Sequence, residues 1–234
     1  MKQGLMRGYQ AVGEVFRTRN LLLFLMGIVL FRACVAVPYT VPSGSMEPTI
    51  FPGDRVLTLM FAYDLRIPLR GDVILRHNTP KVGDVVVFTR PDVPSQTYIK
   101  RVVAVGGQLV SMSGKDLVID GHKLTTQPAK VFDEDAELLG PLDGEPIVLN
   151  ESLGSTEHLA LQDSGSSFSE LWSNRDGFEV PEESYFVMGD NRDHSNDSRS
   201  WGVIRREDIV GKAVVVVWSY GEQMRWWRFL HRFD

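Results

Sequence analysis

The residues best suited to chemistry begin with a short loop that carries two serine hydroxyls. Ser43 and Ser45 lie within VPSGSMEPTI at 41–50, between two prolines and on either side of Gly44. Prolines restrict the backbone and glycine permits a close turn, so the pattern indicates a rigid loop. In such a loop, backbone N–H groups can point at a developing oxyanion, as acyl transfer by a serine nucleophile requires. Taken alone, the same pattern is more often an ordinary turn.

A lysine in a predicted strand is the second candidate. The run YIKRVV at 98–103 places Lys100 on the opposite face from Ile99 and Arg101, because strand side chains alternate. We expect Lys100 to point inward among valines and Arg101 to point to water. Inward lysines without a carboxylate partner are uncommon and often functional. An edge lysine whose stem lies on the sheet is an equal alternative from this segment alone.

A dense polar run follows another predicted strand. Residues 189–199 read GDNRDHSNDSR. Such a run is usually a solvated loop, but its carboxylates and guanidinium groups can also pair and stiffen a loop against a site. His194 lies between Asp193 and Ser195, yet adjacent side chains point apart, so a serine–histidine–aspartate triad is not expected.

Composition and motif searches exclude several function classes. The 234 residues are 43% hydrophobic and 24% charged, which excludes a wholly disordered chain and a polytopic membrane protein. The net charge of −5 disfavours nucleic-acid binding. One cysteine, Cys34, permits neither an intramolecular disulfide nor a multi-cysteine metal site, and the sequence holds no HExxH, GxSxG, SxxK or P-loop. We therefore expect no metal and no cofactor.

The elements that must position these residues are predicted to be strands. They are short, rich in valine and bounded by turn residues, at 85–88, 98–99, 101–105, 117–119, 185–188 and 213–218. Because no regular helices alternate with them, a mainly β fold with an antiparallel sheet is favoured over a doubly wound α/β fold. We expect a β core over 38–110 and 181–220, with an inserted, acidic, loop-rich β subdomain over 111–180. A basic, aromatic tail at 221–234 would rest at a membrane interface or fray.

One segment has the length and apolar character of a membrane anchor. Residues 21–37 are apolar except for Arg32, and as a helix they rise about 26 Å, close to the ~30 Å hydrocarbon core. The basic segment 1–20 before it orients the N-terminus to the cytoplasm. A cleaved signal peptide and a soluble core helix are alternatives, and the long basic lead favours an uncleaved single-pass anchor.

Taken together, the candidate segments resemble the bacterial type I signal peptidases, membrane-anchored Ser–Lys endopeptidases that remove signal peptides from exported proteins. The matching stretches are PSGSMEPT at 42–49, GDVVVF at 83–88, YIKRVV at 98–103 and GDNRDHSNDSR at 189–199. The resemblance covers about residues 20–110 and 181–220, and it treats 111–180 as a variable insertion. It implies a signal-peptidase-like β fold on the outer face of the bacterial inner membrane.

The resemblance also implies a role for each matched residue. Ser45 would be the nucleophile and Lys100 its general base. The Ser45 N–H and the Ser43 hydroxyl would form the oxyanion hole. Ser195 would orient Lys100, and Asp197 and Arg199 would support the site structurally. The residues expected to line pockets for small substrate side chains are Val41, Met46, Ile50, Val87, Tyr98 and Ile99.

The implied chemistry sets a condition on Lys100. A free lysine titrates near ~10.4, so at pH ~8 only about 0.4% of it is neutral and able to accept a proton. Lowering that pKa to about 8 requires burial among apolar residues. A nearby carboxylate would oppose the change, so a neutral hydroxyl such as that of Ser195 suits the orienting role.

The implied partners are the signal peptides of exported preproteins and membrane lipid, with no nucleic acid, and the chain is expected to be monomeric. An alternative from another class is a non-catalytic, membrane-tethered β domain that binds an extracytoplasmic partner, but it leaves the serine loop and the polar run unexplained. A Ser–Lys autoprotease of the repressor-cleaving kind would share the pair, yet it should carry a DNA-binding helical domain, and this sequence indicates none.

Overall fold

The computed structural model describes residues 19–21, 23–24, 27, 36–66, 72–90, 92–93, 95–165 and 177–233. The predicted basic segment and anchor, at 1–20 and 21–37, therefore lie largely outside the described residues. The last two residues of the predicted anchor, Ala36 and Val37, instead begin a strand, because their backbone pairs with that of residues 58–59. None of the helices formed by the described residues combines the length and apolar character needed to span a bilayer.

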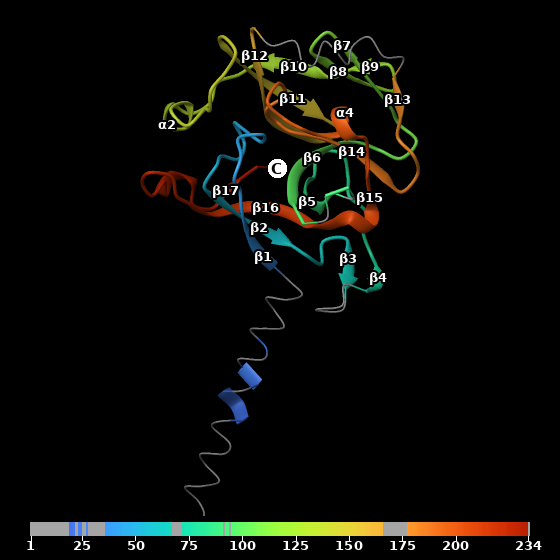
Figure 1. The fold of residues 1–234 in the computed structure, drawn as a ribbon, viewed down its shortest axis with the longest axis vertical. Helices are drawn as coiled ribbons and strands as arrows, with labels where there is room; N and C mark the ends of the chain where they lie inside the picture. The colour runs from blue at the N-terminus through green and yellow to red at the C-terminus, as the bar shows by residue number, and fades with distance from the viewer. Residues whose placement is uncertain are drawn as a thin grey trace, which may run out of the picture.

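The body of the protein is built on one large antiparallel sheet (Figure 1). In the described part of the chain this sheet has eight strands. In spatial order they are β1 (Ala36–Thr40), β2 (Asp54–Leu59), β16 (Ile209–Ser219), β5 (Val85–Thr89), β6 (Thr97–Val105), β14 (Ser184–Met188) and β15 (Ile204–Arg205), while β17 (His231–Arg232) pairs with β16. The predicted antiparallel, mainly β fold is confirmed. The predicted strands at 85–88, 185–188 and 213–218 lie in this sheet, those at 98–99 and 101–105 form the single strand β6, and the one at 117–119 lies in a smaller sheet.

Smaller antiparallel sheets complete the body. One contains β10 (Thr125–Pro128), β11 (Pro146–Leu153) and β12 (Thr156–Asp163), and another contains β13 (Phe178–Glu179), β7 (Leu109–Ser113), β8 (Asp116–Ile119) and β9 (His122–Lys123). Both lie together at one end of the body, and the hairpin of β3 (Asp64–Arg66) and β4 (Val73–Arg76) lies at the other (Figure 1). The short helices are α2 (Asp133–Ala136), α4 (Ser198–Trp201), η1 (Arg206–Asp208) and η2 (Trp226–Arg228).

The central strands are apolar on both faces because both faces are covered. β5 reads VVVFT, and four of its five residues are buried. One apolar cluster lies between β6, β14 and the β7–β8 sheet. A second lies beneath the serine loop and includes Met46, Ile50 and Phe233. Continuous burial of this kind removes the alternation of apolar and polar residues that a half-exposed strand shows.

The C-terminal segment is packed into this body rather than frayed. Strand β17 pairs with β16, and Phe233 is 6% exposed in the cluster beneath the serine loop. Arg228 is completely buried, and it forms ion pairs with Asp54 and Asp135. The aromatic side chains around it are exposed, among them Trp226 at 69%. The segment therefore combines a buried cluster of ion pairs, which holds it to the body, with exposed aromatic side chains.

Candidate active site

The serine loop joins β1 to β2 and is fixed by buried apolar side chains. Met46 and Ile50 are fully buried, and the Ile50 N–H donates a hydrogen bond to the Met46 carbonyl oxygen at 2.9 Å. The Glu47 N–H donates to the Gly44 carbonyl oxygen at 3.1 Å. These contacts close a compact turn around Ser45, whose side chain is largely buried.

Lys100 reaches Ser45 from the middle of β6. Its Nζ lies 2.6 Å from Ser45 Oγ and 2.9 Å from the Ile99 carbonyl oxygen. Lys100 is 3% exposed, and Val86, its cross-strand neighbour on β5, is fully buried. The prediction that Lys100 points inward is therefore confirmed. At this distance, a neutral amine can accept the proton of the serine hydroxyl.

Burial lowers the pKa of the Lys100 amine to about 8, because desolvation disfavours the ammonium form. The negative charges of Asp197 and Asp190 oppose this lowering of the pKa, and the positive charge of Arg199 adds to it. Each of the two carboxylates is paired with a guanidinium group, Asp197 with Arg199 and Asp190 with Arg101. This pairing limits the attraction that the carboxylates exert on a lysine ammonium, so desolvation dominates.

The polar run at 189–199 forms a tightly bonded loop beside the pair. Asp197 is fully buried and accepts hydrogen bonds from the Gly189 N–H at 3.0 Å and from Arg199 Nε and Nη2, both at 2.8 Å. Asp197 also caps α4 by accepting the Arg199 N–H at 3.2 Å. Asp197 and Arg199, predicted as structural support, thus hold the loop together, and their importance for activity stays a prediction.

The strands of the acidic stretch also hold this loop. The Leu161 N–H of β12 donates to the Asp190 carbonyl oxygen at 2.8 Å, and the Arg192 N–H donates to the Leu161 carbonyl oxygen at 2.8 Å. The Arg192 guanidinium is buried and donates to Glu151 of β11, with Nη1 at 3.0 Å from Oε1. Part of the support for the site therefore comes from the 111–180 stretch.

Arg101 differs from its prediction. We expected it to point to water, but it is fully buried and forms a bidentate ion pair with Asp190. Its Nε lies 2.9 Å from Asp190 Oδ1 and its Nη2 lies 2.8 Å from Asp190 Oδ2. Its Nη1 also donates to the Gly83 carbonyl oxygen at 2.8 Å. The alternation argument assumed that one face of β6 was solvated, whereas packed structure covers both faces.

Sequence reasoning missed Asn191, which holds the serine loop directly. Its N–H donates to the Ser45 carbonyl oxygen at 3.2 Å, and its Nδ2 donates to the Gly44 carbonyl oxygen at 3.1 Å. The position of Asn191 in the polar run was visible in the sequence, but its contact with Gly44, 147 residues away, was not.

The two predicted accessory serines lie near the pair. Ser43 Oγ is 3.5 Å from Ser45 Oγ, on the exposed side of the loop. Ser195 is buried, and its hydroxyl helps to lower the pKa of the neighbouring Asp197 carboxyl, although it makes no hydrogen bond of ordinary geometry within the described chain. A hydrogen bond from Ser195 to Lys100 therefore stays a prediction.

The predicted pocket residues separate into two groups. The first group packs in the cluster beneath the serine loop and comprises Val41, Met46, Ile50, Val87 and Ile99. Tyr98 belongs to a different cluster and stacks on Phe88 with ring centroids 5.9 Å apart. In the first group Ile99 is the half-buried member, so it marks the accessible edge of this cluster.

Adding a side chain at Gly189 is expected to disturb the site strongly. A Cβ at this position would lie 2.2 Å from the Ser45 carbonyl oxygen and 2.3 Å from Ser195 Oγ, so the backbone of the serine loop would have to move. We expect Gly189→Ala to lower kcat/KM by about 100-fold, since displacements near 1 Å disturb an attacking group by that factor. Gly140→Ala is the control, because its Cβ would meet its nearest atom at 3.4 Å. Equal peptidase activity in the two variants would contradict this close contact.

The arrangement as a whole defines a chemical class. A loop serine hydroxyl lies against a buried amine with a lowered pKa, and both are held by a rigid β scaffold. This is an arrangement suited to hydrolases that use a serine nucleophile with a lysine base.

Comparisons of the sequence with a family profile and with known proteins all match signal peptidases. The profile of the family described as "Signal peptidase, peptidase S26" matches residues 15–218. Signal peptidase I of Pseudomonas fluorescens is 36% identical over 207 residues, covering 83% of this chain and 69% of that protein. Signal peptidase I of Aquifex aeolicus is 36% identical over 226 residues, covering 86% of this chain and 82% of that protein. The chain therefore belongs to the signal peptidase family, peptidase S26, and is a serine peptidase.

Proposed function

We propose that this chain is a membrane-anchored signal peptidase that cuts exported preproteins after small residues, with Ser45 as nucleophile and Lys100 as general base. The observation that carries the proposal is the 2.6 Å separation of Lys100 Nζ from Ser45 Oγ, with the lysine buried. Membership of the signal peptidase family supports the substrate class.

In the proposed reaction, the neutral Lys100 amine takes the hydroxyl proton as Ser45 Oγ bonds to the carbonyl carbon of the substrate. The Ser45 N–H and the Ser43 hydroxyl donate to the oxyanion that forms. The Lys100 ammonium then gives its proton to the leaving amine as the peptide bond breaks, which leaves an acyl-enzyme. A water molecule deprotonated by the same amine hydrolyses the ester. Ser195 orients Lys100, and Asp197 and Arg199 support the loop.

The proposed substrate is an extended segment that lies along a sheet edge. Its small side chains would enter shallow pockets formed by Val41, Met46, Ile50, Val87, Tyr98 and Ile99. Tyr98 and Ile99 are half-buried, so they would form the accessible part of these pockets, above the buried members of the set.

The proposed location is the outer face of the inner membrane, with 1–20 in the cytoplasm and residues 21–35 as the anchor, because Ala36 and Val37 belong to β1. Ser45 follows the apolar segment by only a few residues, so the reaction would occur at the membrane surface, where a signal peptide emerges. The exposed side chains of Trp226, Trp227 and Phe229 are suited to the lipid interface.

The proposal is tested with the detergent-solubilised full chain and a preprotein substrate. We expect Ser45→Ala to lower processing at least ~1000-fold, because the nucleophile is lost. Ser113→Ala, which changes an exposed serine of β7, should process the preprotein like the unaltered chain. Processing retained by Ser45→Ala would contradict the proposal and favour a non-catalytic β domain that binds an extracytoplasmic partner.

The pH dependence follows from the lowered pKa of Lys100. The base must be neutral, so kcat/KM should rise with pH through a pKa of about 8. At pH 7, about a tenth of the enzyme has the neutral amine, and activity should be about a tenth of its alkaline plateau. The measurement is cleavage of a peptide substrate between pH 6 and 10. A profile that is flat or falls over this range would contradict the role of Lys100 as base.

A further inference from the structure

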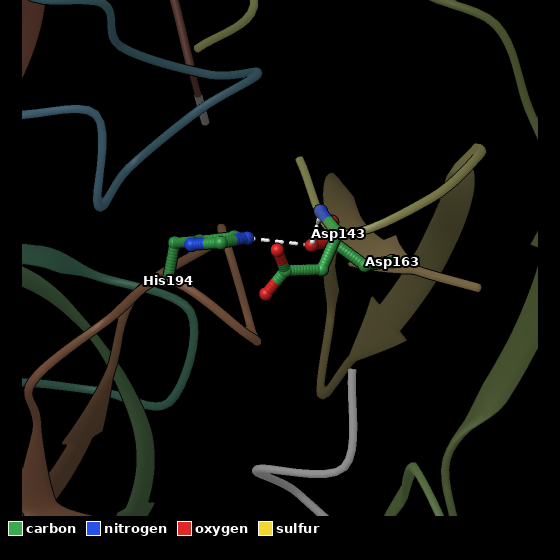
Figure 2. A group of neighbouring side chains, drawn as sticks. All are labelled: Asp143, Asp163 and His194. Carbon is green, nitrogen blue, oxygen red and sulfur yellow. Dashed lines mark hydrogen bonds and ion pairs between the residues drawn. The ribbon is translucent and has the colours of Figure 1, made fainter. Parts of the chain in front are cut away.

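A cluster of one histidine and two aspartates lies on the polar loop but outside the serine–lysine pair. Asp143 precedes β11, Asp163 ends β12, and His194 belongs to the polar loop. The potential ligand atoms of the three residues all lie within 4.8 Å of one another. In Figure 2 the imidazole of His194 points at the two carboxylates, which approach it from the other side of the cluster. Three chain segments thus converge on one point.

Asp163 is the buried centre of this cluster and its bonding is incomplete. Its side chain is 0% exposed, and its Oδ2 accepts the Asp143 N–H at 2.7 Å and lies 2.5 Å from His194 Nε2. Its Oδ1 is also buried and has no hydrogen-bond partner among the described residues. A buried carboxylate oxygen is costly to leave unsatisfied, so a group that binds it would stabilise the fold.

The charge around the cluster favours a cation. The carboxylates of Asp143 and Asp163 lie at the cluster, and that of Asp193 lies beside it and is paired with Lys115. Lys115 Nζ donates to Asp193 Oδ2 at 2.9 Å and to the main-chain carbonyl oxygen of Asp163, which leaves the carboxylate of Asp163 to other partners. The three carboxylates outnumber the one ammonium, so the acidic groups of the cluster favour a bound cation.

We propose that Asp143, Asp163 and His194 bind one divalent first-row transition ion, with Zn²⁺ as the representative case. One imidazole nitrogen and two carboxylate oxygens form a ligand set that Zn²⁺ accepts, with water in the fourth position. Mg²⁺ and Ca²⁺ prefer all-oxygen ligands, so the imidazole selects against them. The His194 side chain is 34% exposed, so its ring can withdraw slightly from Asp163 to admit the ion.

The ion would have a positioning role, not a catalytic one. His194 immediately precedes Ser195 in the chain, and Asp163 continues the strand that holds the polar loop through Leu161. Metal binding would therefore join the 111–180 stretch to the loop beside Ser45 and would stabilise the folded protein increasingly as the free metal concentration exceeds Kd.

The test uses the detergent-solubilised full chain, stripped with a chelator and titrated with ZnCl₂ by calorimetry. We expect one Zn²⁺ per chain, a Tm that rises by a few degrees at saturation, and no comparable effect of MgCl₂ or CaCl₂. CoCl₂ should give visible absorption bands from a site with nitrogen and oxygen ligands.

Two variants and two matched controls locate the binding. His194→Asn and Asp143→Asn change exposed side chains, so both should fold, as checked by circular dichroism, and both should lose the Zn²⁺-dependent rise in Tm. The controls make the same chemical changes at exposed residues outside the cluster, His77→Asn and Asp133→Asn, and should keep it. The proposal is overturned if the unaltered chain binds no Zn²⁺, if either cluster variant binds it as well as the unaltered chain does, or if the controls lose it too.

Discussion

Lys100→Met is expected to abolish peptidase activity and, at the same time, to stabilise the fold at neutral pH. Methionine keeps the length and apolar stem of the side chain but cannot accept a proton, so kcat/KM should fall at least ~1000-fold. The unaltered chain must bury an amine whose pKa is lowered to about 8 from 10.5. At pH 7 that burial costs about 3 kcal/mol, which methionine does not incur, so the free energy of unfolding should rise by about 1–3 kcal/mol.

The stabilisation should depend on pH in a definite direction. Below pH 8 the lysine is protonated in both folded and unfolded chains, and the full penalty is present. Between pH 8 and 10.5 the folded chain is deprotonated first, so the penalty disappears and the unaltered protein gains stability. The difference between the two proteins should therefore shrink toward the alkaline end.

Chemical denaturation at pH 7 and pH 10 measures this difference. The control is Lys130→Met, which changes an exposed lysine and should alter neither activity nor the pH dependence of stability. Destabilisation by Lys100→Met at pH 7, or an equal effect at both pH values, would contradict a desolvation penalty at the buried amine.

Arg228→Met is expected to destabilise the protein more than any surface substitution. Arg228 is 0% exposed and donates to Asp54 through Nε at 3.1 Å and Nη2 at 2.7 Å, to Asp135 Oδ2 at 2.9 Å and to the Thr49 carbonyl oxygen at 3.0 Å. Its guanidinium also lies 4.6 Å from the ring centroid of Phe51. Removing it leaves the fully buried Asp54 carboxylate without its counter-ion, a loss of about 3–5 kcal/mol in the free energy of unfolding.

The measurement is the denaturation midpoint of Arg228→Met beside that of Arg205→Met. Arg205 also forms an ion pair, with Glu207, but its side chain is 73% exposed, so its loss should change stability far less. Because Thr49 and Phe51 belong to the serine loop, Arg228→Met should also lower activity at temperatures where it remains folded. Equal midpoints for the two variants would contradict the importance of the buried cluster.

The sequence was a good guide wherever local pattern decides structure. Valine-rich runs between turn residues became strands, most of them in the main sheet, and alternation correctly predicted that Lys100 points inward. Alternation failed at Arg101, because the partner that allows a guanidinium to be buried, Asp190, lies 89 positions away. Asn191 was missed for the same reason, since a hydrogen bond to a distant loop leaves no periodic signal.

The C-terminal segment shows a second limit of prediction from local sequence pattern. Its sequence indicated an interfacial or frayed tail, and its aromatic side chains are exposed, yet Arg228 and Phe233 are buried in the body. A short basic and aromatic run has the same sequence pattern whether it is exposed or packed. The difference is whether the fold supplies buried carboxylates, here Asp54 and Asp135, to pair with the arginine. The cluster at His194 was not predicted for a similar reason, since the sequence around His194 does not indicate that Asp143 and Asp163 lie beside it.

The burial of Arg228 also bears on the order of events during biosynthesis. Arg228 and its partner Asp54 are separated by 174 positions, and the Phe233 carbonyl oxygen accepts a hydrogen bond from Arg101 at 3.4 Å. Strand β16 lies between β2 and β5, so the main sheet cannot be completed until residues 209–219 have been synthesised. A nascent chain that ends before residue 228 still holds an uncompensated Asp54 carboxylate beneath its serine loop. We therefore expect newly made molecules to remain inactive during synthesis and to become active only once this late segment has been made and packed.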